Sequence, residues 1–161
     1  MQTIGLGYDS HRFAPDGVLK LGGVEIPHDC GLLGHSDADA VLHAVTDAIL
    51  GAAGGDDIGE LFPDTDPQYR GADSRMFLAR ALEIAAGQGL AVVNCDVTIL
   101  AQKPKLADFK KPIRERLAQL LSVPTARVAV KAKTNESMGF VGRSEGIVAL
   151  AAVMLSDTPG A

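Results

Sequence analysis

Two polar side chains near the start of the chain have the types and spacing of metal ligands. The stretch "GYDSHRF", Gly7 to Phe13, places Asp9 and His11 two residues apart after a short apolar lead-in. In an extended strand, residues i and i+2 point to the same face, so a carboxylate oxygen and an imidazole nitrogen lie side by side. Such a pair is half of a divalent-metal site, an acid–histidine pair, or an arrangement with no chemical role.

A third ligand is available from the clearest helical segment, residues 36–52. An Asp9, His11, His43 set leaves a fourth tetrahedral position open, as in catalytic zinc sites. Asp47, one turn beyond His43, would then orient the ring of His43 as a neighbouring carboxylate. The alternatives are that His43 is an exposed helix residue, that Asp9 caps a loop, and that Asp47 is a solvated surface acid.

Two other stretches offer groups that bind anions. In "HSDAD" (35–39), the amide groups of a helix start can bind phosphate, and His35 is either an anion contact or a turn residue. In "GFVGRSEG" (139–146), Arg143 stands among glycines, either as an anion site or in a tight surface turn. Neither pattern is specific on its own.

The stretch "KAKTNES" (131–137) lies at the end of an expected strand. Thr134 and Glu136 alternate onto one face, and Lys133 points to the other. A hydroxyl and a carboxylate suit a phosphate with its magnesium ion, because that ion prefers oxygen ligands. On spacing alone, an ordinary polar strand end is the favoured interpretation.

The elements that must position these groups follow from periodicity and turn residues. The helix at 36–52 has Ser36 as its expected N-cap, with Asp39 as the capping-box partner. Its core stripe is Ala38, Val41, Leu42, Val45, Ala48, Ile49 and Ala52. The other expected elements are strands at 2–9, 91–101, 126–134 and 146–155, helices at 73–88 and 110–121, and a hairpin at 18–27 turning at Gly22-Gly23. Residues 54–67 form a long acidic loop of a kind that is either functional or mobile.

This order predicts an α+β fold, a two-layer sandwich of a mixed β-sheet with helices packed on one face, plus a small β-hairpin. The 161 residues suit a single domain, 1–161. A net charge of −5 argues against a nucleic-acid partner. No apolar run suggests a membrane span or a signal peptide, so we expect a cytoplasmic protein in which Cys30 and Cys95 are buried, reduced thiols.

The chain resembles the 2-C-methyl-D-erythritol 2,4-cyclodiphosphate synthase family. The motifs occur in order along essentially the whole chain: "GYDSHRF", "GLLGHSDADAVLHAVTDAILGAAG", "IGELFPDTDP", "GADSR", "DVTILAQKPKL", "VKAKTNESMGF" and "GRSEGI". The resemblance implies a small α+β domain that forms a homotrimer with active sites between subunits.

The resemblance also implies roles for individual residues. Asp9, His11 and His43 match zinc ligands, Glu136 matches the ligand of a magnesium or manganese ion, and His35 and Thr134 match the catalytic positions. Phe140, Arg143 and Glu145 match a region at the trimer axis, which the resemblance implies as a site for isoprenoid diphosphates. Among the substrate-binding positions, Ser36 matches a phosphate contact, and Asp57, Gly59 and Asp64 match the region around the erythritol group. Phe140 and Arg143 belong to the axis region. The positions that match the cytidine pocket are Ala101, Pro104, Lys105, Leu106, Ala107, Ala132 and Lys133.

The implied reaction cyclises 4-diphosphocytidyl-2-C-methyl-D-erythritol 2-phosphate to the 2,4-cyclodiphosphate and releases CMP, in non-mevalonate isoprenoid biosynthesis. The chain departs from the family at "KTNE", where Lys133 and Asn135 replace frequent threonines, and at Ser144, where glycine is frequent. Two other interpretations fit the residues: a zinc-dependent phosphohydrolase that uses the open position for hydroxide, and a non-enzymatic trimer that binds an isoprenoid phosphate.

Overall fold

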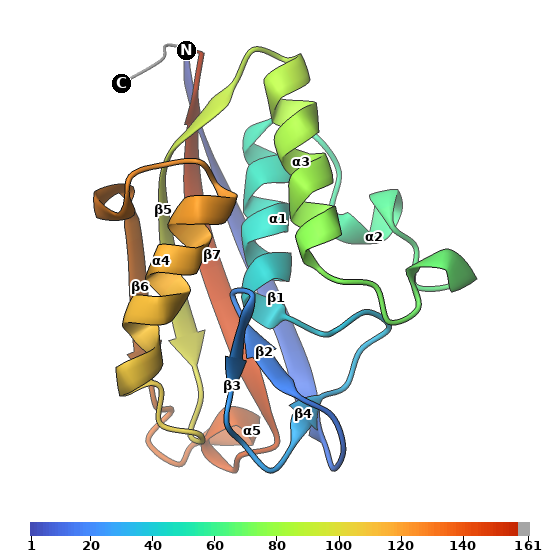
Figure 1. Ribbon diagram of the computed structural model, residues 1–161, viewed down its shortest axis with the longest axis vertical. Coiled ribbons are helices and arrows are strands. Elements are labelled where there is room, and N and C mark those ends of the chain that lie inside the picture. Colours follow the sequence, from blue (N-terminus) through green and yellow to red (C-terminus); the bar gives the residue numbers. More distant parts are fainter. Residues whose placement is uncertain (158–161) are drawn as a thin grey trace.

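The computed structural model describes residues 1–157 and contains a central sheet with the strand order β4-β1-β7-β5-β6 (Figure 1). Strands β2 and β3 form a separate hairpin. The strands are β1 (Gln2–Ala14), β2 (Leu19–Leu21), β3 (Val24–Ile26), β4 (Gly31–Leu32), β5 (Ala91–Leu100), β6 (Val128–Lys133) and β7 (Gly146–Ser156). The helices are α1 (Ala40–Ala52), α2 (Ile58–Leu61), α3 (Arg75–Gly87), α4 (Lys110–Leu120) and α5 (Gly139–Gly142), with 3-10 turns at Pro67–Tyr69, Ala107–Phe109 and Thr125–Arg127.

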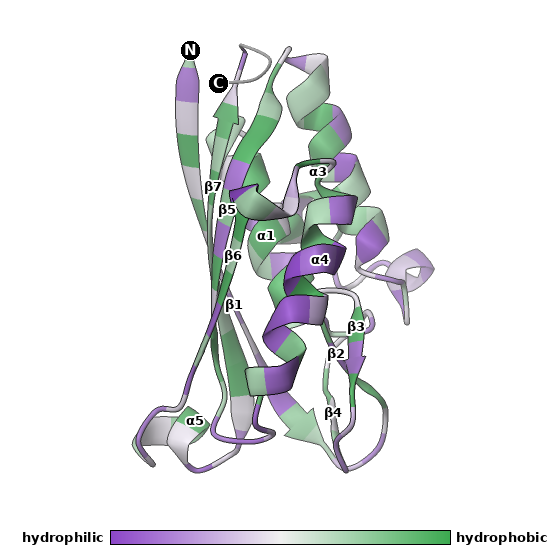
Figure 2. Cartoon of the chain, turned by 60° about the vertical axis from the view of Figure 1, so that its left-hand side comes forward, coloured by the Kyte–Doolittle hydropathy of each residue, from purple (hydrophilic) through white to green (hydrophobic). Residues whose placement is uncertain are grey.

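The layers are those that the sequence predicts. Strands β5 and β6 are parallel and the other neighbours are antiparallel, which makes the sheet mixed. Helices α1, α3 and α4 cover one face of it, and the opposite face carries none of these three (Figure 2). The hairpin turns at Gly22-Gly23, both at positive φ, as expected. None of the helices within residues 1–157 combines the length and apolar character needed to cross a membrane.

Strand β1 is longer than the predicted 2–9, so both Asp9 and His11 lie within it. Eleven of its residues pair with the central strand β7, from Gln2 to Arg12. This extension fixes the two side chains on a rigid element of the sheet.

Helix α1 begins four residues later than the sequence predicts. Its N-cap is Asp39, whose carboxylate accepts from Leu42 N, and the expected capping box on Ser36 is wrong. The reason is a tertiary contact: Asp39 is fully buried and also accepts from the amides of Gly22 and Gly23 in the hairpin turn. Ala38 takes a positive φ of 57°, which excludes it from the helix and leaves Ser36 free to point elsewhere.

Two glycines let α1 lie directly on β1. An ideal Cβ at Gly5 would stand 1.8 Å from the Ala48 carbonyl oxygen, and one at Gly7 would stand 1.8 Å from the Ala44 carbonyl oxygen. No side chain fits in that space. The predicted core stripe of the helix is buried in full, and α1 also packs on α3, so eleven of its thirteen residues are buried.

The other face of the sheet is apolar and uncovered. Ile4, Leu6 and Tyr8 on β1 are 70%, 78% and 56% exposed, and Leu150 on β7 is 41% exposed. They alternate with the buried residues of the same strands. On β5 the predicted inward set is buried, including Cys95, whereas Cys30 is half-buried and both thiols are free.

Candidate metal centre and substrate cavities

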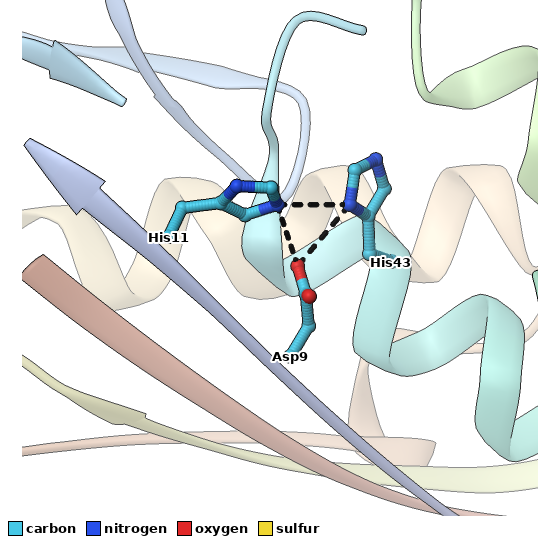
Figure 3. Close-up of side chains that lie close together, drawn as sticks. All are labelled: Asp9, His11 and His43. Atoms are coloured by element: carbon cyan, nitrogen blue, oxygen red, sulfur yellow. Dashed lines mark hydrogen bonds and ion pairs between the residues drawn. The ribbon is translucent and has the colours of Figure 1, made fainter. Parts of the chain in front are cut away.

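Three side chains converge from two elements, Asp9 and His11 from β1 and His43 from the start of α1 (Figure 3). Asp9 Oδ2 lies 2.9 Å from His11 Nε2 and 3.1 Å from His43 Nδ1. The two ring nitrogens are 3.2 Å apart. His43 is buried rather than exposed, and the Asp9 carboxylate, carried by strand β1, contacts both histidines instead of capping a loop. The two structural alternatives considered for these residues are therefore wrong.

The triangle fits a tetrahedral metal ion. Zinc bonds of 2.0–2.1 Å to nitrogen and oxygen would place neighbouring ligand atoms about 3.3 Å apart. The three observed separations are slightly shorter than this value. Within residues 1–157, this is the one group of three metal-ligating side chains that converges, and a carboxylate with two imidazoles is a donor set that zinc accepts.

Within the Asp9, His11, His43 triangle, metal binding is coupled to the protonation of its side chains. Burial by itself raises the pKa of Asp9, but hydrogen bonds with His11 and His43 outweigh it and lower the pKa to about 2. Burial by itself lowers the pKa of His11, but its hydrogen bond to Asp9 outweighs that and raises the pKa. A metal ion therefore competes with a proton on His11, and its binding weakens as pH falls.

Each histidine is held by its second ring nitrogen. His11 Nδ1 lies 2.8 Å from the Leu33 carbonyl oxygen, which orients Nε2 toward Asp9. His43 Nε2 lies 2.8 Å from Ser74 Oγ and 3.1 Å from Ser36 Oγ. Sequence reasoning missed Ser74, because it lies 31 positions from His43 and nothing local connects them.

Asp47 has neither of the roles considered for it. Its carboxylate accepts from Ile58 N at 2.8 Å and so ties the start of α2 to α1. Burial is the main reason that its pKa is raised. The acidic loop is thus anchored to the helix that carries His43.

A cavity of about 500 Å³ opens beside the metal ligands. It brings together the predicted His35, Ser36, Gly59 and Asp64 with His11 and His43. His35 Nε2 lies 3.1 Å from the Asp66 carbonyl oxygen, which fixes the ring at the rim. The predicted Asp57 lies just outside the lining and caps α2 through Gly59 N and Glu60 N.

An aromatic cluster forms one wall of this cavity and was not predicted. Phe62 packs against Phe77 at a centroid distance of 4.6 Å, and Tyr69 packs edge-on against Phe62 at 5.5 Å. The Phe77 ring also stands 6.0 Å from that of His43. The chain has only five Phe and two Tyr, so three of its seven aromatic side chains gather beside the metal ligands.

A second cavity of about 250 Å³ lies at the carboxyl ends of β5 and β6. Thr134 Oγ1 at its edge donates to Glu136 Oε1 at 2.6 Å, and Glu136 is exposed at a positive φ of 49°. Asn135 donates to the Met138 carbonyl and shapes the turn. The lining contains all the predicted cytidine residues: Ala101, Pro104, Lys105, Leu106, Ala107, Ala132 and Lys133.

The two cavities share no lining residue within one chain. The predicted axis residues lie apart from both. Phe140 is 42% exposed on the short helix α5, and exposed Arg143 pairs with Glu145 at 2.6 Å. The short helix α5 was not among the elements expected from the sequence.

Known proteins match the chain over nearly its whole length. The YgbB family model matches residues 2–156. A 2-C-methyl-D-erythritol 2,4-cyclodiphosphate synthase of Cupriavidus metallidurans is 57% identical over 152 residues, 94% of this chain and 90% of that protein. A bifunctional enzyme IspD/IspF of Caulobacter vibrioides is 52% identical, and this chain spans 41% of its length.

Solved structures agree with the fold. The bifunctional IspDF of Campylobacter jejuni has a TM-score of 0.92 at 43% identity, over 96% of this chain and 42% of that one. The IspF of Plasmodium falciparum, solved as a CDP complex, has a TM-score of 0.83 at 34% identity, over 96% and 95%. With these matches, the chain belongs to the YgbB family of 2-C-methyl-D-erythritol 2,4-cyclodiphosphate synthases.

Proposed function

We propose that the chain converts 4-diphosphocytidyl-2-C-methyl-D-erythritol 2-phosphate into 2-C-methyl-D-erythritol 2,4-cyclodiphosphate and CMP. The observation that carries the proposal is the Asp9, His11, His43 triangle, whose two histidines line the larger cavity, in a chain 57% identical to a synthase of that name. Relatives solved with CDP support a cytidyl group on the substrate.

The reaction is an intramolecular phosphoryl transfer. An oxygen of the 2-phosphate forms a bond to the β-phosphorus, and the bond from that phosphorus to the bridging oxygen breaks. CMP leaves with the bridging oxygen, so neither water nor a protein nucleophile is consumed. Such chemistry needs positioning and charge neutralisation most of all.

Zinc held by Asp9, His11 and His43 would supply Lewis acidity to a phosphate oxygen. His35 and Ser36, on the same cavity, would hold that phosphate from its other side. The aromatic wall of Phe62, Tyr69 and Phe77 would exclude water from the reacting groups, which favours cyclisation over hydrolysis.

The second half of the site would bind the cytidine diphosphate. Lys105, Lys110 and Lys133 on the smaller cavity bring positive charge to a chain whose net charge is −5. The Thr134 hydroxyl would donate to a phosphate oxygen in place of its present bond to Glu136. The released Glu136 carboxylate would then meet a magnesium or manganese ion, which prefers such oxygen ligands.

Glu136→Gln is expected to keep zinc at full occupancy while the magnesium concentration for half-maximal turnover rises about tenfold. The amide is close to the carboxylate in shape but lacks its charge, which hard cations require. The measurement is turnover titrated with magnesium, alongside zinc analysis of the same preparation. An unchanged titration curve would refute the role of Glu136.

We propose further that the protein is a homotrimer with each active site built from two chains. The two half-sites lie in separate cavities of one chain, so neither is complete alone. The uncovered face of Ile4, Leu6, Tyr8 and Leu150 is the apolar surface that a partner subunit would bury. In a cyclic trimer the interface is head-to-tail, so every chain offers each half-site to a different neighbour.

Mixing two inactive variants is expected to restore activity. His43→Ala chains keep the second half-site, and Glu136→Ala chains keep the metal triangle. Any mixed trimer contains one junction at which both halves are intact, so equal mixing should recover about a quarter of wild-type activity. The variants are denatured and refolded together, with refolded wild type as control. Mixed trimers that form but stay inactive would contradict the shared site.

Product analysis tests the reaction itself. The protein is incubated with the cytidyl substrate, zinc and magnesium, and the products are followed by phosphorus NMR. A cyclic diphosphate with CMP supports the synthase, a linear phosphate supports a phosphohydrolase, and binding without turnover supports a non-enzymatic trimer.

A further inference from the structure

Of the two ring nitrogens of His43, only Nδ1 faces Asp9 and His11. Nε2 points away, toward the hydroxyls of Ser74 and Ser36. A neutral imidazole carries one proton, and the nitrogen that binds a metal ion cannot be the one that carries it. Metal binding through Nδ1 therefore requires the proton on Nε2. A group that accepts a hydrogen bond from Nε2 favours this tautomer, which is the one that can bind a metal ion.

Ser74 is placed to accept this hydrogen bond from Nε2. Its side chain is fully buried, with 0% exposure. It stands at the N-cap position of α3, yet it makes no capping hydrogen bond to its own helix. The hydroxyl lies between His43 Nε2, at 2.8 Å, and Asp37 Oδ1, which also accepts from Ser74 N at 3.2 Å.

The direction of the hydrogen bonds follows from the carboxylate. An ionised Asp37 only accepts, so the Ser74 hydroxyl donates to it. Since the hydroxyl proton of Ser74 is used in that bond, its oxygen can only accept a hydrogen bond from His43, and Nε2 must be the donor. Lys20 on the hairpin stands 3.8 Å from the other oxygen of Asp37 and adds a positive charge at the far end.

We infer that Ser74, backed by Asp37, is a positioning residue that fixes the tautomer and ring orientation of His43 and so sets the affinity of the Asp9, His11, His43 site for its metal ion. The inference rests on the proposed metal site and adds to it. Ser36 is the weaker partner of Nε2, at 3.1 Å, and it faces the cavity, where a phosphate competes for it.

The test is a zinc titration of metal-free protein against a competing chromogenic chelator. Ser74→Ala is expected to raise the zinc Kd about 10- to 100-fold, the usual cost of losing such a partner. Asp37→Ala should act in the same direction, because a freed Ser74 hydroxyl can donate to Nε2 and favour the wrong tautomer. Ser74→Thr keeps the hydroxyl and should restore the Kd to within a few-fold of wild type.

The controls separate this role from a general loss of stability. Ser122→Ala removes an exposed serine beyond α4 and should leave the zinc Kd unchanged. Thermal unfolding of each metal-free variant shows whether it is folded. If Ser74→Ala is unfolded, the zinc Kd of Asp37→Ala decides the test. A folded Ser74→Ala with a zinc Kd within twofold of wild type, or an unchanged Kd in Asp37→Ala, overturns the inference. Wild-type protein that binds no zinc overturns the metal site and this inference together.

Discussion

If the triangle holds zinc as proposed, replacing His43 by alanine is expected to abolish zinc binding and to lower turnover by about three orders of magnitude or more. The triangle has no fourth protein side chain to substitute, since Asp9, His11 and His43 are the only such cluster within residues 1–157. Lewis-acid stabilisation is worth several kcal/mol, and each 1.36 kcal/mol is about tenfold in rate. Metal analysis and turnover of the purified variant are the measurements.

His28→Ala is the matched control, because His28 contacts Phe13 and lies outside both cavities. It should keep zinc and activity. A thermal unfolding experiment should show that His43→Ala is folded at the start, since α1 retains its alanine and leucine contacts. Full zinc occupancy in His43→Ala would show that the triangle does not hold the metal.

Adding one methyl group at Gly7 is expected to destabilise the protein by about 3 kcal/mol or more, the upper range for overpacked cores. The new Cβ would stand 1.8 Å from a backbone oxygen of α1, so the whole helix has to move. For a chain of this size, that loss lowers the melting temperature by roughly 6–12 °C. Thermal unfolding of Gly7→Ala at fixed protein concentration measures it.

Gly51→Ala is the control within α1 itself. Outside its chain neighbours and the backbone of its own helix, a Cβ at Gly51 meets no atom within 4 Å. Alanine is also the better helix former, so this variant should be as stable as wild type or more so. Gly7→Ala should also weaken zinc binding, because a shifted α1 carries His43 away from Asp9. A melting temperature equal to that of wild type would show that the helix can yield without cost.

The parts of the site that repeat with a simple period could be predicted from the sequence. Asp9 and His11 share a face because strand side chains alternate, and the stripe from Val41 to Ala52 fixes how α1 lies on the sheet. These two facts together place His43 near the strand pair. The residues predicted to bind cytidine, by contrast, followed from family resemblance, since nothing in their spacing indicates a cavity.

The errors arose where a tertiary contact outweighs local preference. Ser36 is a good N-cap residue, but the hairpin amides of Gly22 and Gly23 hold Asp39, and the helix starts after it. Ser74 reaches His43 only because α3 packs on α1. The aromatic wall has the same origin: Phe62 follows α2, Tyr69 lies in the 3-10 turn and Phe77 lies on α3, and the three rings meet only in the fold.

Strand β1 has two faces with different tasks, and this limits which insertions and deletions the chain can accept. Gly5, Gly7, Asp9 and His11 point toward α1, and Ile4, Leu6 and Tyr8 alternate with them on the uncovered face. Removing or adding one residue here exchanges the faces of every position on one side of the change. Leucine and tyrosine would then point at α1 while the carboxylate and imidazole pointed away. A single-codon length change in β1 would thus abolish the metal ligands and the apolar face at once, whereas the loop after α1 has no such alternation to preserve.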